Sequence, residues 1–339
     1  MRVNRSSQRG VALIVVLLIL AIMVSLAASM SERMFIRFQR ASHQINYQQA
    51  YWYSVGVENL ALALIKESHK DDSDTVNLSQ AWAQQNRKLP LDYGELIGSI
   101  VDKQACFNLN AFNGLESSGG SSTPFVKQFF ENLLQNVNVD GATAEIIADS
   151  TWEFVDSNDT VSTTYGVEDS YYDSLSPAYL PPNGLMAVPS ELRAVQQVSG
   201  QTMQQLLPML CALPTSEWQL NVNTINEKQA LLLVAMFSPN LSLENAKAVI
   251  SSRPKKGWSS VSDFEAEPQI AAINSTVRSK AEGFLAVNSQ YFELDAQVVV
   301  NDSRLRVRSL IYSEDKDNAT VIRRRYGGIS ERISDRSAE

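Results

Sequence analysis

The most distinct pattern in the 339-residue chain is an apolar run, VALIVVLLILAIMVSLAASMS, which starts at Val11 and carries no formal charge before Glu32. About 20 apolar residues can cross a membrane as a helix, because a helix satisfies its own backbone hydrogen bonds in hydrocarbon. Arginines and no acidic residue precede the run, so the positive-inside rule keeps those residues cytoplasmic. The pattern predicts one membrane helix over residues 11–31, with the rest of the chain on the opposite side.

Helical character continues beyond this segment. The stretch from Met30 to Ser68 contains no proline, and apolar positions recur along it at helical spacing, among them Tyr51, Val57 and Ile65. We therefore predict one continuous helix from Val11 to about Ser68, roughly 85–90 Å long at about 1.5 Å per residue. Half of it would lie in lipid and half would pack on a globular head.

Two segments alternate apolar and polar residues with the period of two that strands require. The first is ELIGSIVDKQACFNLNAF, from Glu95, which follows a polar linker expected from Lys70 to Lys88. The second runs from about Phe284 to Val321 and is interrupted by turn residues at 301–302 and 315–318. Because a helix-rich insertion separates them, we predict an α+β fold. It is a type IV pilin-like head, with a long N-terminal helix on an antiparallel β-meander, and it carries a large, mainly α-helical inserted domain.

The expected division of the chain follows from these patterns. It comprises a leader (1–10), the membrane helix (11–31), the first part of the head (32–109), the α-helical insertion (110–283), the antiparallel strands of the head (284–326) and a polar tail (327–339).

The residues alone leave three interpretations of the N-terminus open. A secretory signal peptide would be cleaved near Ala28, within LAAS, whereas a plain signal anchor would not be cleaved. A class III prepilin leader would be cut after Gly10, with N-methylation of the new first residue, Val11. The abrupt Arg9-Gly10-Val11 junction, together with a helix that continues past the membrane, favours the prepilin leader of a pilin-like subunit.

One residue departs from the usual pilin pattern. The fifth position after the expected cut is Val15, where major pilins carry a glutamate that pairs with the N-terminal amine of a neighbouring subunit. Such a pair offsets the cost of a carboxylate in hydrocarbon. A subunit with Val15 is poorly suited to the interior of a helical fibre but is tolerable at its end.

Composition excludes some classes of function. The net charge of −8 and the pI near 5.0 disfavour a nucleic-acid-binding protein, because phosphate binding depends on clustered Lys and Arg. The two histidines, His43 and His69, both fall in the long helix, so a hydrolase that needs a positioned base is disfavoured. We therefore expect no enzyme.

The two cysteines, Cys106 and Cys211, match no CxxC motif. In an oxidising compartment they are expected to form one long-range disulfide. The alternative is a pair of buried free thiols.

Acidic residues gather in a segment that lacks Lys and Arg, from Gln128 to Leu192. Like charges at this density are either solvated or bridged by a cation, and a cation bound by oxygen atoms alone points to calcium. An EF-hand is excluded, because Val161 and Val167 occupy positions six and twelve of a loop that starts at Asp156. On the residues alone, a solvated acidic loop is the simpler interpretation.

Four features together resemble the general secretion pathway protein K family, the large minor pseudopilins of type II secretion systems. The first is the glycine junction without a Glu five residues on. The others are CFNLNAF at 106–112, FVDSND…GVEDSYY…YLPPNGL…ELR at 154–193, and LNVNTINEKQALLLVAMF at 220–237. They span nearly the whole chain in order.

The resemblance implies calcium binding in the acidic segment. Carried over residue by residue, it gives these candidate ligands: Asp156, Asp159, Glu168 and Asp169, followed by Asn158, Asp173 and Asn183. It also implies a non-enzymatic subunit that caps the tip of the periplasmic pseudopilus. Its partners would be the other minor pseudopilins, the prepilin peptidase and the inner membrane, with the secretin or secreted substrate as further candidates.

The segment from Leu220 to Ala266 also resembles a helix-hairpin-helix, in which NVNT at 221–224 opens the first helix. Ser238-Pro239-Asn240 replaces the glycines that hold a phosphate in DNA-binding versions, so we interpret it as a structural module. The NLNA at 108–111 would begin a second, degenerate copy.

The rival hypothesis belongs to another class. It is a signal-anchored or secreted periplasmic protein that binds or hydrolyses a ligand alone. The mature N-terminus would distinguish the two.

Overall fold

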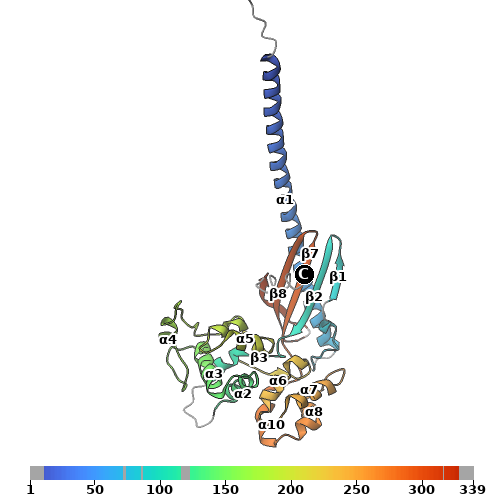
Figure 1. The fold of residues 1–339 in the computed structure, drawn as a ribbon. Coiled ribbons are helices and arrows are strands. Elements are labelled where there is room, and N and C mark those ends of the chain that lie inside the picture. Colours follow the sequence, from blue (N-terminus) through green and yellow to red (C-terminus); the bar gives the residue numbers. More distant parts are fainter. Residues whose placement is uncertain (1–10, 72–73, 85–86, 116–122, 316, 328–339) are drawn as a thin grey trace, which may run out of the picture.

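The fold was analysed in a computed structural model that describes residues 11–71, 74–84, 87–115, 123–315 and 317–327. The expected leader, Gly10 and all but the first residue of the expected tail lie outside these ranges. Within them, a long helix, a five-stranded sheet and a helical domain follow one another along the molecule (Figure 1).

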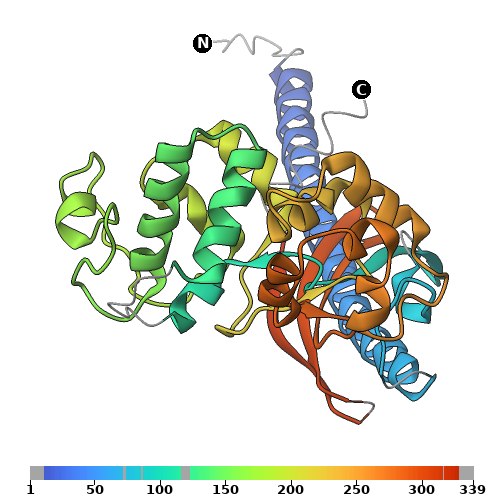
Figure 2. The same cartoon turned by 90° about the horizontal axis from the view of Figure 1, so that it is seen from below.

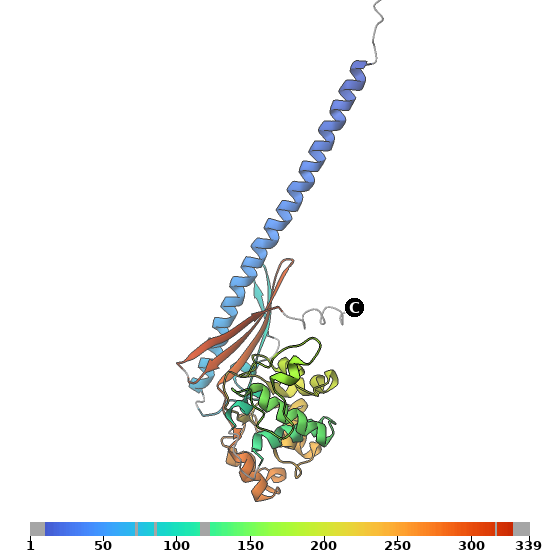
Figure 3. The same ribbon diagram turned by 90° about the vertical axis from the view of Figure 1, so that its left-hand side faces the viewer.

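Helix α1 (Val11–Asp71) confirms the continuous helix expected from the sequence. Its N-terminal half projects away from the rest of the molecule (Figure 3) and is exposed. Its C-terminal half buries Ala50, Val57, Ala61 and Ile65 against the sheet. These residues are spaced by seven, four and four positions, which places them on one helical face. α1 therefore has an unpartnered half and a half that belongs to the head.

The five-stranded sheet is antiparallel throughout, in the order β1-β2-β7-β8-β9. Its strands are β1 (Arg87–Leu91), β2 (Gly94–Asp102), β7 (Tyr291–Val300), β8 (Ser303–Ser313) and β9 (Ala319–Tyr326). Along β7 every second residue is buried against α1, as the period of two predicts. The meander and both of its turns are confirmed, whereas β1 falls partly in the segment that was expected to be a linker.

An inserted domain occupies the chain between β2 and β7 and lies at the end of the sheet farthest from the N-terminus of α1 (Figures 1 and 3). Its α-helices are α2 (Phe125–Asn136), α3 (Gly141–Val155), α4 (Asp169–Asp173), α5 (Gly200–Leu206), α6 (Ala230–Met236), α7 (Leu243–Ser252), α8 (Val261–Glu265), α9 (Pro268–Ala271) and α10 (Ser275–Glu282). Short 3-10 helices are η1 (Ala81–Ala83), η2 (Leu109–Gly114), η3 (Pro189–Ala194), η4 (Leu207–Met209) and η5 (Glu227–Gln229), of which η1 precedes the insertion.

The inserted domain has two lobes (Figure 2), each introduced by a two-residue parallel strand pair. β3 (Phe107–Asn108) pairs with β4 (Leu210–Cys211), and β5 (Leu220–Asn221) pairs with β6 (Leu285–Ala286). In the first lobe, the side chain of Asn110 accepts a bond from the N–H of Met186 (2.8 Å) and donates one to its carbonyl oxygen (2.9 Å). In the second, Asn223 does the same with Trp258, at 2.7 and 3.0 Å. This correspondence supports the expected duplication.

Two local expectations are wrong. Leu109–Phe112 forms the 3-10 helix η2 instead of a strand, because the side chain of Asn108 accepts a bond from the N–H of Asn110 and caps it. The NVNT segment does not open a helix directly. The Asn221 side chain accepts a bond from the N–H of Asn223 at 2.9 Å, which holds a turn, and the helical turns begin only at Glu227.

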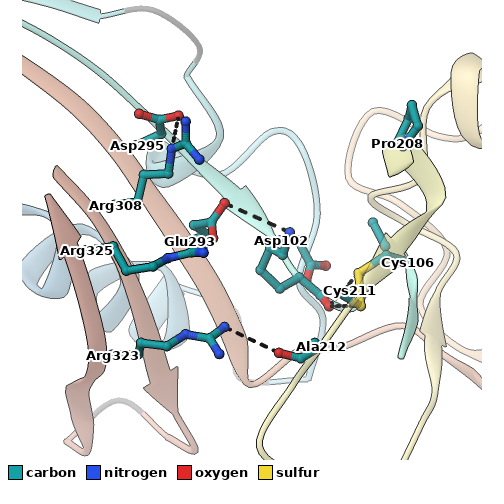
Figure 4. A network of polar contacts seen from close by, with 12 residues as sticks. Asp102, Cys106, Pro208, Cys211, Ala212, Glu293, Asp295, Arg308, Arg323 and Arg325 are labelled. Carbon is teal, nitrogen blue, oxygen red and sulfur yellow. Dashed lines mark hydrogen bonds and ion pairs between the residues drawn. A yellow bond between two sulfur atoms is a disulfide. The ribbon is translucent and has the colours of Figure 1, made fainter. Parts of the chain in front are cut away.

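Polar side chains join the sheet to the inserted domain, and one disulfide within the inserted domain lies beside this junction (Figure 4). Cys106 and Cys211 form a disulfide with a Cα–Cα distance of 5.8 Å. Arg323 of β9 reaches across to the carbonyl oxygen of Ala212 at 3.3 Å. Helix α1 is tied to the sheet as well, because Arg324 donates to the buried carboxylate of Glu58 at 2.6 Å.

Candidate metal centre

The acidic segment packs against the C-terminal end of α3, and its geometry starts from that helix. Asp149 and Glu153 lie one turn apart on α3, and both are fully buried. Asp149 forms an ion pair with Lys127 at 2.6 Å. Among the described residues, no lysine or arginine pairs with Glu153. Its carboxylate instead accepts bonds from the N–H groups of Ser162 (2.8 Å) and Thr163 (2.6 Å). These bonds fold the loop after α3 back over the helix.

Three carboxylates meet where this loop returns. Oxygen atoms of Glu153, Asp156 and Glu168 lie within 4.8 Å of one another. Glu153 and Glu168 are buried, and Asp156 is partly exposed. Negative charges this close, two of them removed from water, repel strongly unless one is protonated or a cation lies between them.

Glu168 is the most unusual member of the group. It is 4% exposed, and neither of its carboxylate oxygens has a hydrogen-bond partner among the described residues. Burial raises the pKa of Glu168 to about 8, with further contributions from the negative charges of Asp156, Glu153 and Asp169. A buried polar atom without a partner is costly, so a bound ligand is the natural explanation.

Of the remaining predicted residues, Asp169, Asp159 and Asn158 lie beside this group. Buried oxygens of Asp169 and Asn183 also lack a partner in the described part of the chain, and Asp159 is close enough to raise the pKa of Glu168. The amide of Asn158 is used locally, since its nitrogen donates to Asp156 at 2.8 Å and its oxygen accepts from the N–H of Thr160 at 3.0 Å. Asp173 is exposed at the end of α4.

Sequence reasoning missed Glu153. A weak signal for it exists, because Glu145, Asp149 and Glu153 follow one another at intervals of four in the helix that leads into the acidic loop. The assembled donor set consists of oxygen atoms only, and carboxylates dominate it. This chemistry suits a hard cation that takes six to eight oxygen ligands, whereas zinc prefers nitrogen and sulfur.

The other predicted positions lie elsewhere. Val11 is the first residue of α1, and Val15 is 47% exposed on its first turns. Helix α1 is long and apolar enough to cross a membrane, with a mean hydropathy of 3.2 in its most apolar window, none of which is buried. A single such helix near the N-terminus is compatible with a single-pass anchor.

Comparisons with known proteins agree with this architecture. Two family models described as "Type II secretion system (T2SS), protein K" match residues 105–215 and 220–288. Type II secretion system protein K of Aeromonas hydrophila is 37% identical over 329 residues, which cover 96% of this chain and 98% of that protein. The protein of the same name from Klebsiella pneumoniae is 37% identical over 320 residues, which cover 94% and 97%.

A solved structure is similar over the same length. It is that of the GspK-GspI-GspJ complex from the enterotoxigenic Escherichia coli type 2 secretion system, with a TM-score of 0.78 and 36% sequence identity. The match covers 85% of this chain and 99% of that chain. On these grounds the chain belongs to the type II secretion system protein K family.

Proposed function

We propose that this chain caps the tip of the type II secretion pseudopilus and helps to initiate its assembly for the export of folded proteins across the outer membrane. Its membership of the protein K family makes it a minor pseudopilin of that system. The observation that carries the proposal is the similarity, along nearly the whole of the matched chain, to a structure in which GspK is assembled with GspI and GspJ. The corresponding minor pseudopilins are the proposed partners.

The architecture supports a place at the end of a fibre. The inserted domain makes the head much wider than the sheet and helix alone (Figures 1 and 2). Subunits with such heads would collide if they were repeated along a tightly packed fibre. The apolar Val15 near the start of α1 agrees with this, because it offers no carboxylate to the amine of a neighbouring subunit.

The proposal includes a membrane stage before assembly. α1 would anchor the chain in the inner membrane with the head in the periplasm, after prepilin peptidase has cut at Gly10 and Val11 has been N-methylated. The secretin and secreted substrate would be contacted later, and no catalytic step is assigned to this chain.

Two measurements test this proposal against an anchored protein that acts alone. Mass spectrometry of the chain from membranes should find a first residue at N-methylated Val11. The full-length chain, co-expressed with the two neighbouring minor pseudopilins, should co-purify with both. A chain that starts near Ser29 and purifies alone would exclude assembly at the tip.

We also propose that the three-carboxylate group holds calcium. Glu153, Asp156 and Glu168 would supply the charge, and the unpartnered oxygens of Asp169 and Asn183 would complete the donor set. The ion would neutralise the repulsion between the acids and fix the loop against α3. Calcium fits better than magnesium, because flexible loops with mixed carboxylate and amide oxygens do not enforce a tight octahedron.

Isothermal titration of the full-length chain in detergent tests the metal proposal. Calcium should bind, magnesium should bind more weakly, and Glu168→Gln should abolish the calcium signal. Asp302→Asn is the matched control, because Asp302 is an exposed acid in the turn between β7 and β8. Equal calcium binding by wild type and Glu168→Gln would exclude this site.

A further inference from the structure

A polar pocket of about 370 Å³ lies where the sheet meets the inserted domain. We call it the tyrosine pocket. Its lining combines two tyrosines with uncharged polar side chains and one carboxylate, Glu217, and no lysine or arginine of the described chain lines it. The amides that line it are Gln104, Gln219, Asn288 and Gln290. Its volume falls in the range of about 300–1,000 Å³ that is typical of ligand sites, which often form at domain junctions.

The two tyrosines are placed by the sheet. Tyr291 opens β7 and is in register with Tyr312 of β8. Both alternate with buried residues, Phe292 and Ile311, so they lie on the face of the sheet opposite α1. Their ring centroids are 5.1 Å apart with an interplanar angle of 52°. Together they form a partly exposed aromatic surface.

The opposite wall is held rigidly. Asn108 donates to the carbonyl oxygens of Thr215 (2.8 Å) and Glu217 (3.1 Å), and the indole N–H of Trp218 donates to the carbonyl oxygen of Cys106 at 2.9 Å. Behind the wall, the Cys106–Cys211 disulfide packs in one cluster with Leu213 and Tyr291. A loop fixed in this way loses little conformational entropy when a ligand binds.

Polar groups of the pocket are left available. Among the described residues, the side chains of Asn288 and Gln290, the carboxylate of Glu217 and both tyrosine hydroxyls make no hydrogen bond within the chain. The Gln104 side-chain oxygen accepts a bond from the N–H of Gln290 at 2.6 Å, which leaves its amide nitrogen as a donor. Amides, hydroxyls and a carboxylate therefore present donors and acceptors side by side.

A second pocket of about 540 Å³ shares the lining residues Glu217, Trp218 and Gln219 with the first. Phe284 also lines this second pocket, and its ring stacks on that of Phe125 with the two centroids 4.6 Å apart. Because the two pockets share three lining residues, they are neighbours. Adjacent pockets of this kind suit a linear ligand, whose successive units would occupy one pocket each.

We propose that this site binds a neutral linear oligosaccharide. A phosphate or other anion is disfavoured because no cationic side chain lines either pocket, and Glu217 would repel it. A lipid is disfavoured by the polar lining of the tyrosine pocket. A sugar ring suits the site, because its C–H face stacks on an aromatic ring while its hydroxyls donate to and accept from amides and carboxylates.

Binding of defined tetrasaccharides to the full-length chain tests the proposal. Chitotetraose, cellotetraose and maltotetraose would each be titrated by calorimetry, in a detergent without a sugar headgroup so that the detergent does not compete. At least one should bind, and Tyr312→Ala should weaken its association about tenfold or more through loss of the stacking surface. Gln290→Ala, which changes an exposed side chain outside the core, should also weaken it.

Tyr93→Ala is the matched control, because Tyr93 is an exposed tyrosine of the same head that lies outside the pocket. It should bind the tetrasaccharide like the wild type. Failure of all three sugars to bind, or equal binding by wild type and both pocket variants, would overturn the proposal. Preferential binding of an alanine tetrapeptide in their place would assign the site to a peptide instead.

Discussion

Two buried carboxylates in this protein show opposite solutions to the same problem. Asp102, at the end of β2, is 8% exposed and accepts four bonds: from Asn221 (3.0 Å), Thr224 (2.6 Å), Ser289 (2.6 Å) and the N–H of Gln104 (2.7 Å). Glu168, in the acidic loop, is 4% exposed and accepts none from the described residues. Burial raises the pKa of both groups.

On the calcium proposal, the difference separates a structural acid from one that binds a cation. The donors around Asp102 come from the chain just after β2, from the start of the second lobe and from the chain before β7. The carboxylate therefore joins the sheet to the inserted domain without a bound ligand. Glu168 lies beside other acids, and its carboxylate has no donor among the described residues. Burial alone therefore does not identify a site, whereas burial without donors does.

The largest expected effect is that of Asp102→Ala. The substitution leaves four donors without an acceptor in the interior, which should lower the free energy of unfolding by about 3–5 kcal/mol. Denaturant unfolding of the full-length chain in detergent would measure it. The loss should be the same with calcium and with EGTA, and a loss below about 1 kcal/mol would show that the donors find water instead.

Removal of calcium should come next. A ligand present at 100 times its dissociation constant stabilises the folded state by about 2.7 kcal/mol, so EGTA should lower the melting temperature of the wild type by roughly 3–6 °C. Calorimetry with EGTA and then with excess calcium would test this. An unchanged melting temperature would mean that the acids are relieved by protonation rather than by a metal.

Glu168→Gln and Asp102→Asn should change stability in opposite directions in EGTA. The glutamine removes one of three repelling charges and can donate to its neighbours, so we expect a gain of about 1 kcal/mol. The asparagine turns one acceptor into a donor opposite the amide of Asn221, so we expect a loss of about 1–2 kcal/mol. Parallel melting curves of the two variants would measure both effects, and losses of similar size would contradict the contrast.

Much of the fold could be predicted from local pattern. The uninterrupted helical sequence of α1 and the period-two alternation of β7 and β8 gave their elements correctly, because both signals lie within single segments. β1 was placed partly in a linker because Pro90 and two charged residues weaken its alternation. The helix expected at NVNT is absent because the Asn221 side chain holds a local turn, while the Asn223 side chain bonds to the backbone of Trp258, 35 residues away.

The candidate metal site was harder to predict from the sequence. The acidic loop identified Asp156 and Glu168, since a local run of acids without bases is visible in the sequence. Glu153 was missed because it reads as an ordinary helical residue, and only tertiary packing shows that it is buried beside the other two. The hydrogen-bond network of Asp102 was equally hard to predict. Its three side-chain donors lie more than 100 residues away in the sequence.

A dependence of stability on pH tests the role of Asp102 as a structural acid. Burial raises the pKa of Asp102, so the folded chain holds this proton more tightly than the unfolded chain does. The resulting stability is fully present below the ordinary pKa near 3.8 and is lost as the pH rises through the higher value in the folded state, by about 1.4 kcal/mol for each unit of the shift. Compared with Asp102→Asn, the wild type should therefore become relatively less stable between pH 4 and neutrality, equally in calcium and in EGTA. Stability differences measured at several pH values would test this. A difference between the two chains that stays constant across that range would show that the four donors hold the pKa of Asp102 at its ordinary value.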